Sequence, residues 1–196
     1  MTNDPSTRKT ILNAAKEALV ETGYSGLSTR GIAQRANVPL SQIHYHFGTK
    51  QALMLEVLEV ENQRLLARQE RLYESDMPLW KQWEQACDFL EDDMESGYVR
   101  VLQELTAAGW ADPEIAAAVK EMLGKWFSLL AEVAREAVSR LGDLGPFTPE
   151  EVALLTGAPF LGVETMLLLG FGEAEMPARS ALRKVGELIR ALEDRR

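Results

Sequence analysis

The sequence predicts an all-α protein of about nine helices, three short ones in front and six mostly longer ones behind. No stretch shows sustained alternation of apolar and polar residues, and clusters of strand-favouring residues are missing. Apolar residues recur instead at helical spacing, as in the stripe formed by Ile11, Leu12, Ala15 and Leu19. With 196 residues, 46% of them hydrophobic, the chain can bury a core in one or two domains.

Each boundary of the three front helices has a residue that explains it. The pair Asp4-Pro5 provides an N-cap and a first-turn proline for the first helix, and Gly23 ends that helix. Ser28 caps a second helix, which runs to about residue 35. Residues 36–39 form a tight turn, because asparagine tolerates a left-handed backbone and proline fixes φ. The third helix covers about residues 40–46.

Six further helices follow a break at Gly48. Thr49 caps the first of them, which runs from about 50 to 74. Thr148-Pro149-Glu150-Glu151 is the strongest start signal, because it combines a capping box with proline at the first helical position. The other expected helices cover about 78–95, 98–108, 113–140, 149–170 and 178–194. The chain therefore divides into a front domain, residues 1–50, and a rear domain, residues 51–196.

The charge is distributed unevenly between these two domains. Residues 1–50 hold six basic and three acidic side chains, a net charge of +3, whereas residues 51–196 hold 15 basic and 27 acidic ones, a net charge of −12. A basic front suggests contact with a polyanion, although compositional scatter can give the same pattern. The polar N-terminus shows no signal peptide and the single cysteine, Cys87, cannot form an internal disulfide, so we expect a cytoplasmic protein.

The third helix predicts a polar, carboxylate-free outer face. At about 100° per residue, Ile43 and Phe47 fall on one side of this helix and anchor it. Its outward-facing residues are Ser41, Gln42, His44 and Tyr45. Donors and acceptors without a carboxylate suit the major groove of DNA, where polar side chains read base edges. The second helix, the turn and the third helix together make a helix-turn-helix, although such helix pairs also occur in proteins that bind no DNA.

Both histidines of the chain lie in this helix, which raises the question of a metal or catalytic site. His44 and His46 stand about 200° apart on a helix, so they cannot bind one metal ion. No GxSxG motif occurs and no cysteine lies nearby, so neither histidine has a nucleophile to activate. We expect no metal, no cofactor and no catalytic residues.

The front of the chain resembles the TetR family of bacterial transcriptional repressors. Residues 8–55 carry three motifs that are specific in combination: GYSGLSTRGIA, VPLSQIHYHF and KQAL. Behind residue 60 the resemblance is one of length and helical architecture only. Two residues depart from the commoner pattern, because His44 stands where tyrosine is frequent and Leu40 where a polar residue is frequent. Both departures leave the operator sequence open.

The resemblance implies a role for each matching residue. Thr29 and Arg30 would contact DNA from the start of the second helix. His46 and Lys50 would contact phosphates. The readers of base edges would be Ser41, Gln42, His44 and Tyr45, the same four residues that the helical geometry turns outward. For His46 that geometry favours a position at the boundary of the apolar side.

The resemblance also implies a rear domain that dimerises and binds a ligand. The helices at 149–170 and 178–194 would pair with their mates in a four-helix bundle, giving a homodimer. The apolar segment 152–171 raises the possibility of a membrane span, but Glu164 and Pro159 lie inside it and no basic residue flanks it closely. We therefore favour a buried helix of a soluble protein, with no membrane partner.

A small, largely apolar effector would bind among the aromatic middle helices. The candidate pocket residues are Trp80, Trp83, Phe89, Trp110, Trp126, Phe127, Glu164 and Thr165. Each aromatic residue could equally belong to an ordinary core. The implied function is a repressor that leaves a palindromic double-stranded DNA operator when the effector binds.

Three other readings stay open. The chain could be a helical protein-interaction module, or a DNA binder that responds to no effector. It could also be an all-helical enzyme that uses the acidic cluster Glu91, Asp92, Asp93 and Glu95, but a solvated acidic helix face is the simpler explanation of that cluster.

Overall fold

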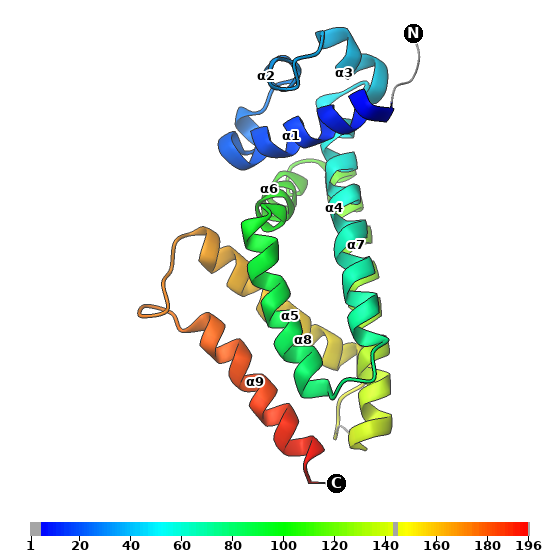
Figure 1. Ribbon diagram of the computed structural model, residues 1–196, viewed down its shortest axis with the longest axis vertical. Coiled ribbons are helices and arrows are strands. Elements are labelled where there is room, and N and C mark those ends of the chain that lie inside the picture. Colours follow the sequence, from blue (N-terminus) through cyan, green and yellow to red (C-terminus); the bar gives the residue numbers. More distant parts are fainter. Residues whose placement is uncertain (1–4, 143–144, 196) are drawn as a thin grey trace. The chain divides into compact units, whose positions relative to one another are not determined.

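The computed structural model describes residues 5–142 and 145–195, and its regular structure there is entirely helical (Figure 1). The nine described helices are α1 (Pro5–Gly26), α2 (Thr29–Arg35), α3 (Leu40–Phe47), α4 (Lys50–Tyr73), α5 (Leu79–Glu95), α6 (Tyr98–Gly109), α7 (Pro113–Leu141), α8 (Pro149–Leu168) and α9 (Ala178–Glu193). Each bound lies within about three residues of the predicted one. The all-α prediction is confirmed.

The first helix differs in detail from the prediction. Gly23 does interrupt it, with φ 70° and ψ 169°, but a further turn continues to Gly26. A positive φ of this size suits glycine, because a side chain would meet the backbone there. Asp4, the expected N-cap, lies outside the described residues. The other predicted signals are confirmed: Ser28 and Thr49 accept hydrogen bonds from the backbone of the following turn, and Asn37 has φ 53°.

The helices form two compact units. The front unit contains residues 5–64 and 97–122, so α6 and the start of α7 join α1–α3 and the first part of α4. The rear unit contains residues 65–96 and 123–195, which include α5, α8 and α9. In the front unit, α1 packs against α2 and α6, and α2 against α3. Its core is built from Ile11, Ala15, Leu19, Ile32, Ala33, Ile43, Phe47, Leu53, Met54 and Leu105, among others.

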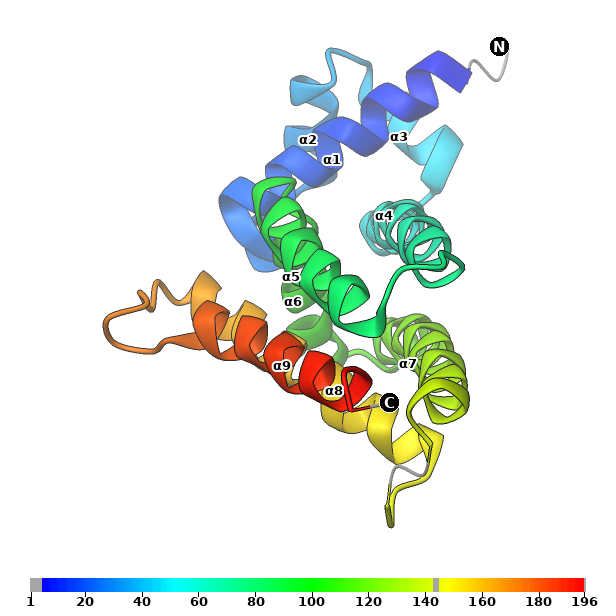
Figure 2. The ribbon, with the colours of Figure 1, turned by 60° about the horizontal axis from the view of Figure 1, so that its bottom comes forward.

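In the rear unit, α5 and α9 run antiparallel alongside each other (Figure 2). The Trp83 indole N–H donates to the Leu182 carbonyl at 2.6 Å, and Gly186 lets the ring approach, because a Cβ there would lie 3.3 Å from it. The pairs Arg179–Glu91 and Arg183–Asp88 extend the contact toward the end of α5. At the other end, the Glu193 carboxylate accepts the backbone N–H groups of Leu79 and Trp80, at 3.0 and 3.2 Å.

Glu193 therefore caps α5, whose own N-cap, Pro78, makes no side-chain hydrogen bond. We expect Glu193→Ala to lower the free energy of unfolding by about 1 kcal/mol, the usual cost of a lost cap. Urea denaturation at fixed protein concentration measures this change. Glu187→Ala removes an exposed carboxylate from the same helix and should shift stability by less than about 0.5 kcal/mol. Equal shifts for the two variants would contradict the capping role.

Helix α8 is more exposed than the sequence suggested. Its buried residues, Ala153, Gly157 and Glu164, lie on one face, while Leu154 is 55% exposed. Only 22% of its most apolar stretch is buried within the chain, so one chain does not by itself supply the burial predicted for this helix. The reason is that its neighbours within the chain cover one side of it only. Among the described residues, α8 alone is long and apolar enough to cross a membrane, and one such helix is weak evidence of a span.

Candidate nucleic-acid interface

Helix α3 presents a polar face on an apolar anchor. Ile43 is fully buried and Phe47 nearly so, as the helical geometry predicts. Ser41, His44 and Tyr45 are exposed, and Gln42 is half-buried at the edge of their face. The turn that precedes α3 owes its shape to Asn37 and Pro39, and Gly48 ends the helix with φ 73°. A short exposed helix is thus held in a fixed orientation within the front unit.

His44 is fixed by a local hydrogen bond. Its ring Nδ1 lies 3.0 Å from the Gly48 carbonyl oxygen, four residues further on. A carbonyl can only accept, so Nδ1 carries the hydrogen and donates it. In the neutral ring, Nε2 is then an acceptor. Such a group can accept a hydrogen bond from the amino group of cytosine or adenine in the major groove.

Tyr45, His46 and Phe47 are consecutive aromatic residues at the end of α3, and each ring contacts that of the next residue. The Tyr45 and His46 ring centroids are 5.0 Å apart at 77°, an edge-to-face contact, and those of His46 and Phe47 are 6.0 Å apart. His46 is half-buried, which matches the boundary position that the helical geometry predicts. The Arg8 guanidinium lies over the Phe47 ring at 5.3 Å and pairs with Glu56. Tyr45 alone of these rings is largely exposed.

Two helix starts flank α3 in the chain, and both present backbone N–H groups. At α2, the Ser28 hydroxyl accepts the N–H of Gly31, while Thr29 is half-buried and Arg30 exposed. At α4, the Thr49 hydroxyl accepts the N–H of Ala52 at 3.0 Å. The free N–H groups and positive dipole end of a helix start favour a phosphate. Of the six basic residues up to position 50, Lys9 and Arg30 are the exposed ones without an ion pair among the described residues.

Lys50, the predicted phosphate contact, is engaged within the protein. Its ammonium donates to the Tyr24 carbonyl at 3.1 Å and lies 4.3 Å from the centroid of the Tyr24 ring. Burial raises the pKa of the Tyr24 phenol, and the nearby Asp112 carboxylate raises it further. The phenol therefore stays neutral beside the lysine. Nothing in the sequence indicated that Tyr24 holds this side chain.

The five aromatic pocket candidates of the rear unit are half-buried and mostly pack against side chains of that unit. The Trp80 ring lies under the Arg190 guanidinium at 4.9 Å, and the Phe89 ring under that of Arg68 at 4.1 Å. Trp83 makes an edge contact with Phe160. Trp126 donates its indole N–H to the Gln69 side-chain oxygen at 2.8 Å, and Phe127 lies 5.0 Å from it.

The remaining three candidates are placed differently. Trp110 belongs to the front unit, where it is 84% exposed at the end of α6. Glu164 is buried on the inner face of α8, as expected for a carboxylate in an apolar helix that finds a partner. Thr165 is exposed and donates its hydroxyl to the Leu161 carbonyl at 3.1 Å. The structure thus brings only part of the predicted set together.

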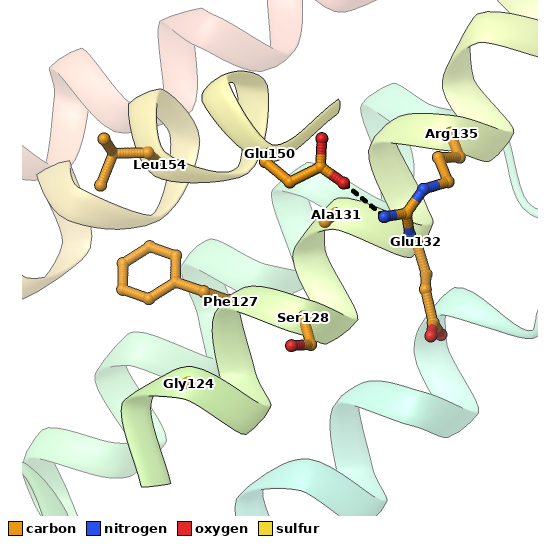
Figure 3. A pocket seen from close by; sticks show the side chains of 8 residues that line it. All are labelled: Gly124, Phe127, Ser128, Ala131, Glu132, Arg135, Glu150 and Leu154. Atoms are coloured by element: carbon orange, nitrogen blue, oxygen red, sulfur yellow. Dashed lines mark hydrogen bonds and ion pairs between the residues drawn. The ribbon is translucent and has the colours of Figure 1, made fainter. Parts of the chain in front are cut away.

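A cavity of about 550 Å³ lies between α7 and the start of α8 (Figure 3). Phe127 and Leu154 line one end of it, and the Arg135–Glu150 ion pair lines the other. The remaining lining residues are Gly124, Ser128, Ala131 and Glu132. Hydrogen bonds at the start of α8, and the neighbouring Arg135 guanidinium, lower the pKa of the Glu150 carboxyl. Phe127 is the one predicted pocket residue that lines this cavity.

Two of the four carboxylates in the acidic cluster on α5 form close ion pairs, whereas Asp92 and Glu95 are exposed. Glu91 pairs with Arg179 and Asp93 with Arg68, at 2.7 and 2.6 Å, and both carboxylates are half-buried rather than freely solvated. In the described part of the chain, no group of three metal-ligating side chains is gathered. Burial raises the pKa of the Cys87 thiol to about 11, so this cysteine is a protonated core residue at neutral pH.

Comparison with known proteins agrees with the geometry of the front unit. Residues 11–57, which contain the helix-turn-helix, match the family model of bacterial regulatory proteins, tetR family. The HTH-type transcriptional regulator UidR of Escherichia coli K12 is 26% identical over 184 residues, which cover 89% of this chain and 86% of UidR. The family model describes bacterial regulatory proteins, and UidR is a transcriptional regulator rather than an enzyme.

Two solved structures share the fold over almost the whole chain. GusR of Salmonella enterica superposes with a TM-score of 0.79 at 19% identity, covering 99% of this chain and 98% of GusR. FadR of Bacillus subtilis, solved in complex with stearoyl-CoA, has a TM-score of 0.78 at 15% identity, covering 92% and 96%. Similarity at this level shows the fold alone. Residues 11–57, which contain the helix-turn-helix, match the TetR family of bacterial regulatory proteins, and the chain as a whole shares the fold of solved TetR-family regulators.

Proposed function

We propose that the chain is a dimeric repressor that binds a palindromic operator through α3 and is released from it by a small, largely apolar effector. The observation that carries the DNA-binding part is the exposed, carboxylate-free face of α3 on its buried anchors, Ile43 and Phe47. In this proposal residues 1–50 form the DNA-binding domain, with base contacts from Ser41, Gln42, His44 and Tyr45. The backbone contacts come from Thr29, Arg30, His46 and Lys50.

The exposed apolar face of α8 and α9 supports a homodimer. Leu154 and Leu155 on α8, and Leu188 and Leu192 on α9, are all at least half exposed in the single chain. Monomeric proteins rarely leave such a surface uncovered. We propose that a second copy of the chain, rather than lipid, covers this apolar face. Helix α8 contains the carboxylate of Glu164, and the helices beside it, α5 and α9, are joined by ion pairs; both features disfavour a membrane. Two copies then present two α3 helices to two half-sites.

The effector part of the proposal rests on the rear unit. FadR of Bacillus subtilis, which shares this fold, was solved in complex with stearoyl-CoA, a ligand with a long acyl chain. The cavity lined by Phe127 and Leu154 is of a size that small-molecule sites have. An effector acts only through a difference in affinity for the two states of the dimer. Titration of candidate apolar compounds into an operator complex tests this part, and failure of every compound would favour a DNA binder without an effector.

Lys50→Ala should weaken binding to all duplexes alike. The ammonium is proposed to meet a phosphate, so its loss should reduce the slope of log K against log salt by about one. A fluorescence titration across a salt series measures both quantities. Lys184→Ala, which removes an exposed lysine from α9, should leave the slope unchanged. An unchanged slope for Lys50→Ala would remove this residue from the interface.

The alternative of a protein-interaction module is distinguished by the wild-type chain in the same titration. A DNA binder loses affinity steeply as salt rises, because counterions are released on binding. A helix-turn-helix that serves only protein contacts would show no preference for any duplex over a polyanionic competitor.

A further inference from the structure

The break in α1 creates a contact with α6, 80 residues further along the chain. The backbone N–H of Tyr24, directly after the break at Gly23, donates to the Glu104 Oε2 atom at 2.9 Å. The other carboxylate oxygen of Glu104 pairs with Arg100 Nη2 at 2.7 Å. Glu104 is half-buried, and each of its two carboxylate oxygens has a partner: Tyr24 on α1 and Arg100 on α6.

Glycine makes this close approach possible at two positions. A Cβ on Gly23 would lie 3.1 and 3.2 Å from the two carboxylate oxygens of Glu104, which is tighter than ordinary contact. A Cβ on Gly97, just before α6, would lie 2.9 Å from the Val20 Cγ2 atom of α1. The carboxylate therefore occupies the space that a side chain at position 23 would take.

Tyr24 carries the contact on to the start of α4. Its carbonyl and its ring hold the Lys50 ammonium, and Lys50 follows the end of α3 by three residues. The start of α4 is tied to the corner between α6 and α7 as well, because the Gln51 amide donates to Asp112 at 3.3 Å and to Glu114 at 2.9 Å. A single residue, Tyr24, thus separates the Glu104 carboxylate from Lys50, the lysine that follows α3.

We propose that Glu104 is a positioning residue for operator binding, which acts through Tyr24 on Lys50. The carboxylate fixes the backbone of Tyr24, and Tyr24 fixes the place from which the ammonium reaches a phosphate. Without that anchor the long lysine side chain loses its fixed rotamer and must be ordered on binding. The inference rests on DNA binding by the front unit and on the proposed phosphate contact of Lys50.

Four variants on a duplex selected with the wild-type protein test the proposal: Glu104→Ala, Glu104→Gln, Lys50→Ala and Glu104→Ala/Lys50→Ala. Glu104→Ala should weaken binding about tenfold and reduce the salt slope by about one, as Lys50→Ala does. Glu104→Gln should stay within about threefold of wild type, because its amide oxygen still accepts the Tyr24 N–H. The double variant should bind no more weakly than Lys50→Ala alone.

The sign of the change in DNA affinity distinguishes a positioning role of Glu104 from a general effect of its negative charge. Removing one carboxylate makes the net charge less negative than −9, which by itself would strengthen binding to a polyanion. Glu70→Ala, an exposed carboxylate on α4, provides this control. Circular dichroism and thermal melting check that every variant is folded.

Three results would overturn the proposal. The first is operator binding by Glu104→Ala that is as tight as that of the wild type, or tighter. The second is an equal loss of affinity in Glu104→Ala and Glu104→Gln with an unchanged salt slope, and the third is a double variant whose loss of affinity is the sum of the losses in Glu104→Ala and Lys50→Ala. If Lys50→Ala weakens binding while Glu104→Ala does not, only the positioning role fails. If the wild-type chain selects no duplex, the proposed function fails with it.

Discussion

Replacing His44 and Tyr45 together with alanine should reduce the preference for the selected operator over random DNA by about thirtyfold or more. Each base contact is worth about 1–3 kcal/mol of discrimination, and these two side chains are the exposed ring-bearing residues of α3. The loss should appear as weaker operator binding with little change in binding to random DNA. Competition titrations with the two duplexes measure the ratio directly.

Asn13→Ala is the matched control, because it removes an exposed polar side chain from α1 in the same unit. It should leave the ratio unchanged. The His44 and Tyr45 side chains are both exposed, so their removal should shift the melting temperature little. If the double variant lost affinity for operator and random DNA equally, these residues would be backbone contacts rather than readers of bases.

Aspartate at Leu154 and Leu188 should separate the subunits. Leu188 is 67% exposed on α9 and Leu154 is 55% exposed on α8, so neither change should disturb the fold of one chain. In the proposed dimer the changes remove four buried leucines and add four carboxylates to an apolar interface. We expect a cost of at least about 4 kcal/mol, or about a thousandfold in the dissociation constant. Analytical ultracentrifugation across a concentration series measures it.

Val138→Asp is the control for this experiment, because it places the same carboxylate on an exposed apolar position of α7. It should leave the dimer intact. Operator binding should fall together with dimerisation, since a lone subunit contacts one half-site only. A double variant that stays dimeric would place the interface elsewhere than on α8 and α9.

Local signals explain why the helices could be predicted so closely. The capping residues Ser28, Thr49 and Thr148 and the left-handed Asn37 act within a few residues of themselves, so the sequence shows them directly. The buried anchors of α3 follow from helical periodicity alone. The exposed face of α3 was predicted for the same reason.

Contacts between distant segments could not be predicted in this way. The Glu104–Tyr24–Lys50 connection joins residues up to 80 positions apart, and nothing near any of them indicates the others. Trp110 counted as a pocket candidate on residue type, yet it is exposed in the front unit. The cavity beside the Arg135–Glu150 pair depends on how α7 and α8 pack, which periodicity does not specify.

Selection of bound sites from a random duplex library, in the presence of a polyanionic competitor, tests whether the chain reads a palindromic operator as a dimer. We expect enrichment of one inverted repeat, with half-site centres about 10 base pairs or a multiple apart and one dimer bound per repeat. Enrichment of no sequence, or of a site without two-fold symmetry bound by a single subunit, would contradict this expectation.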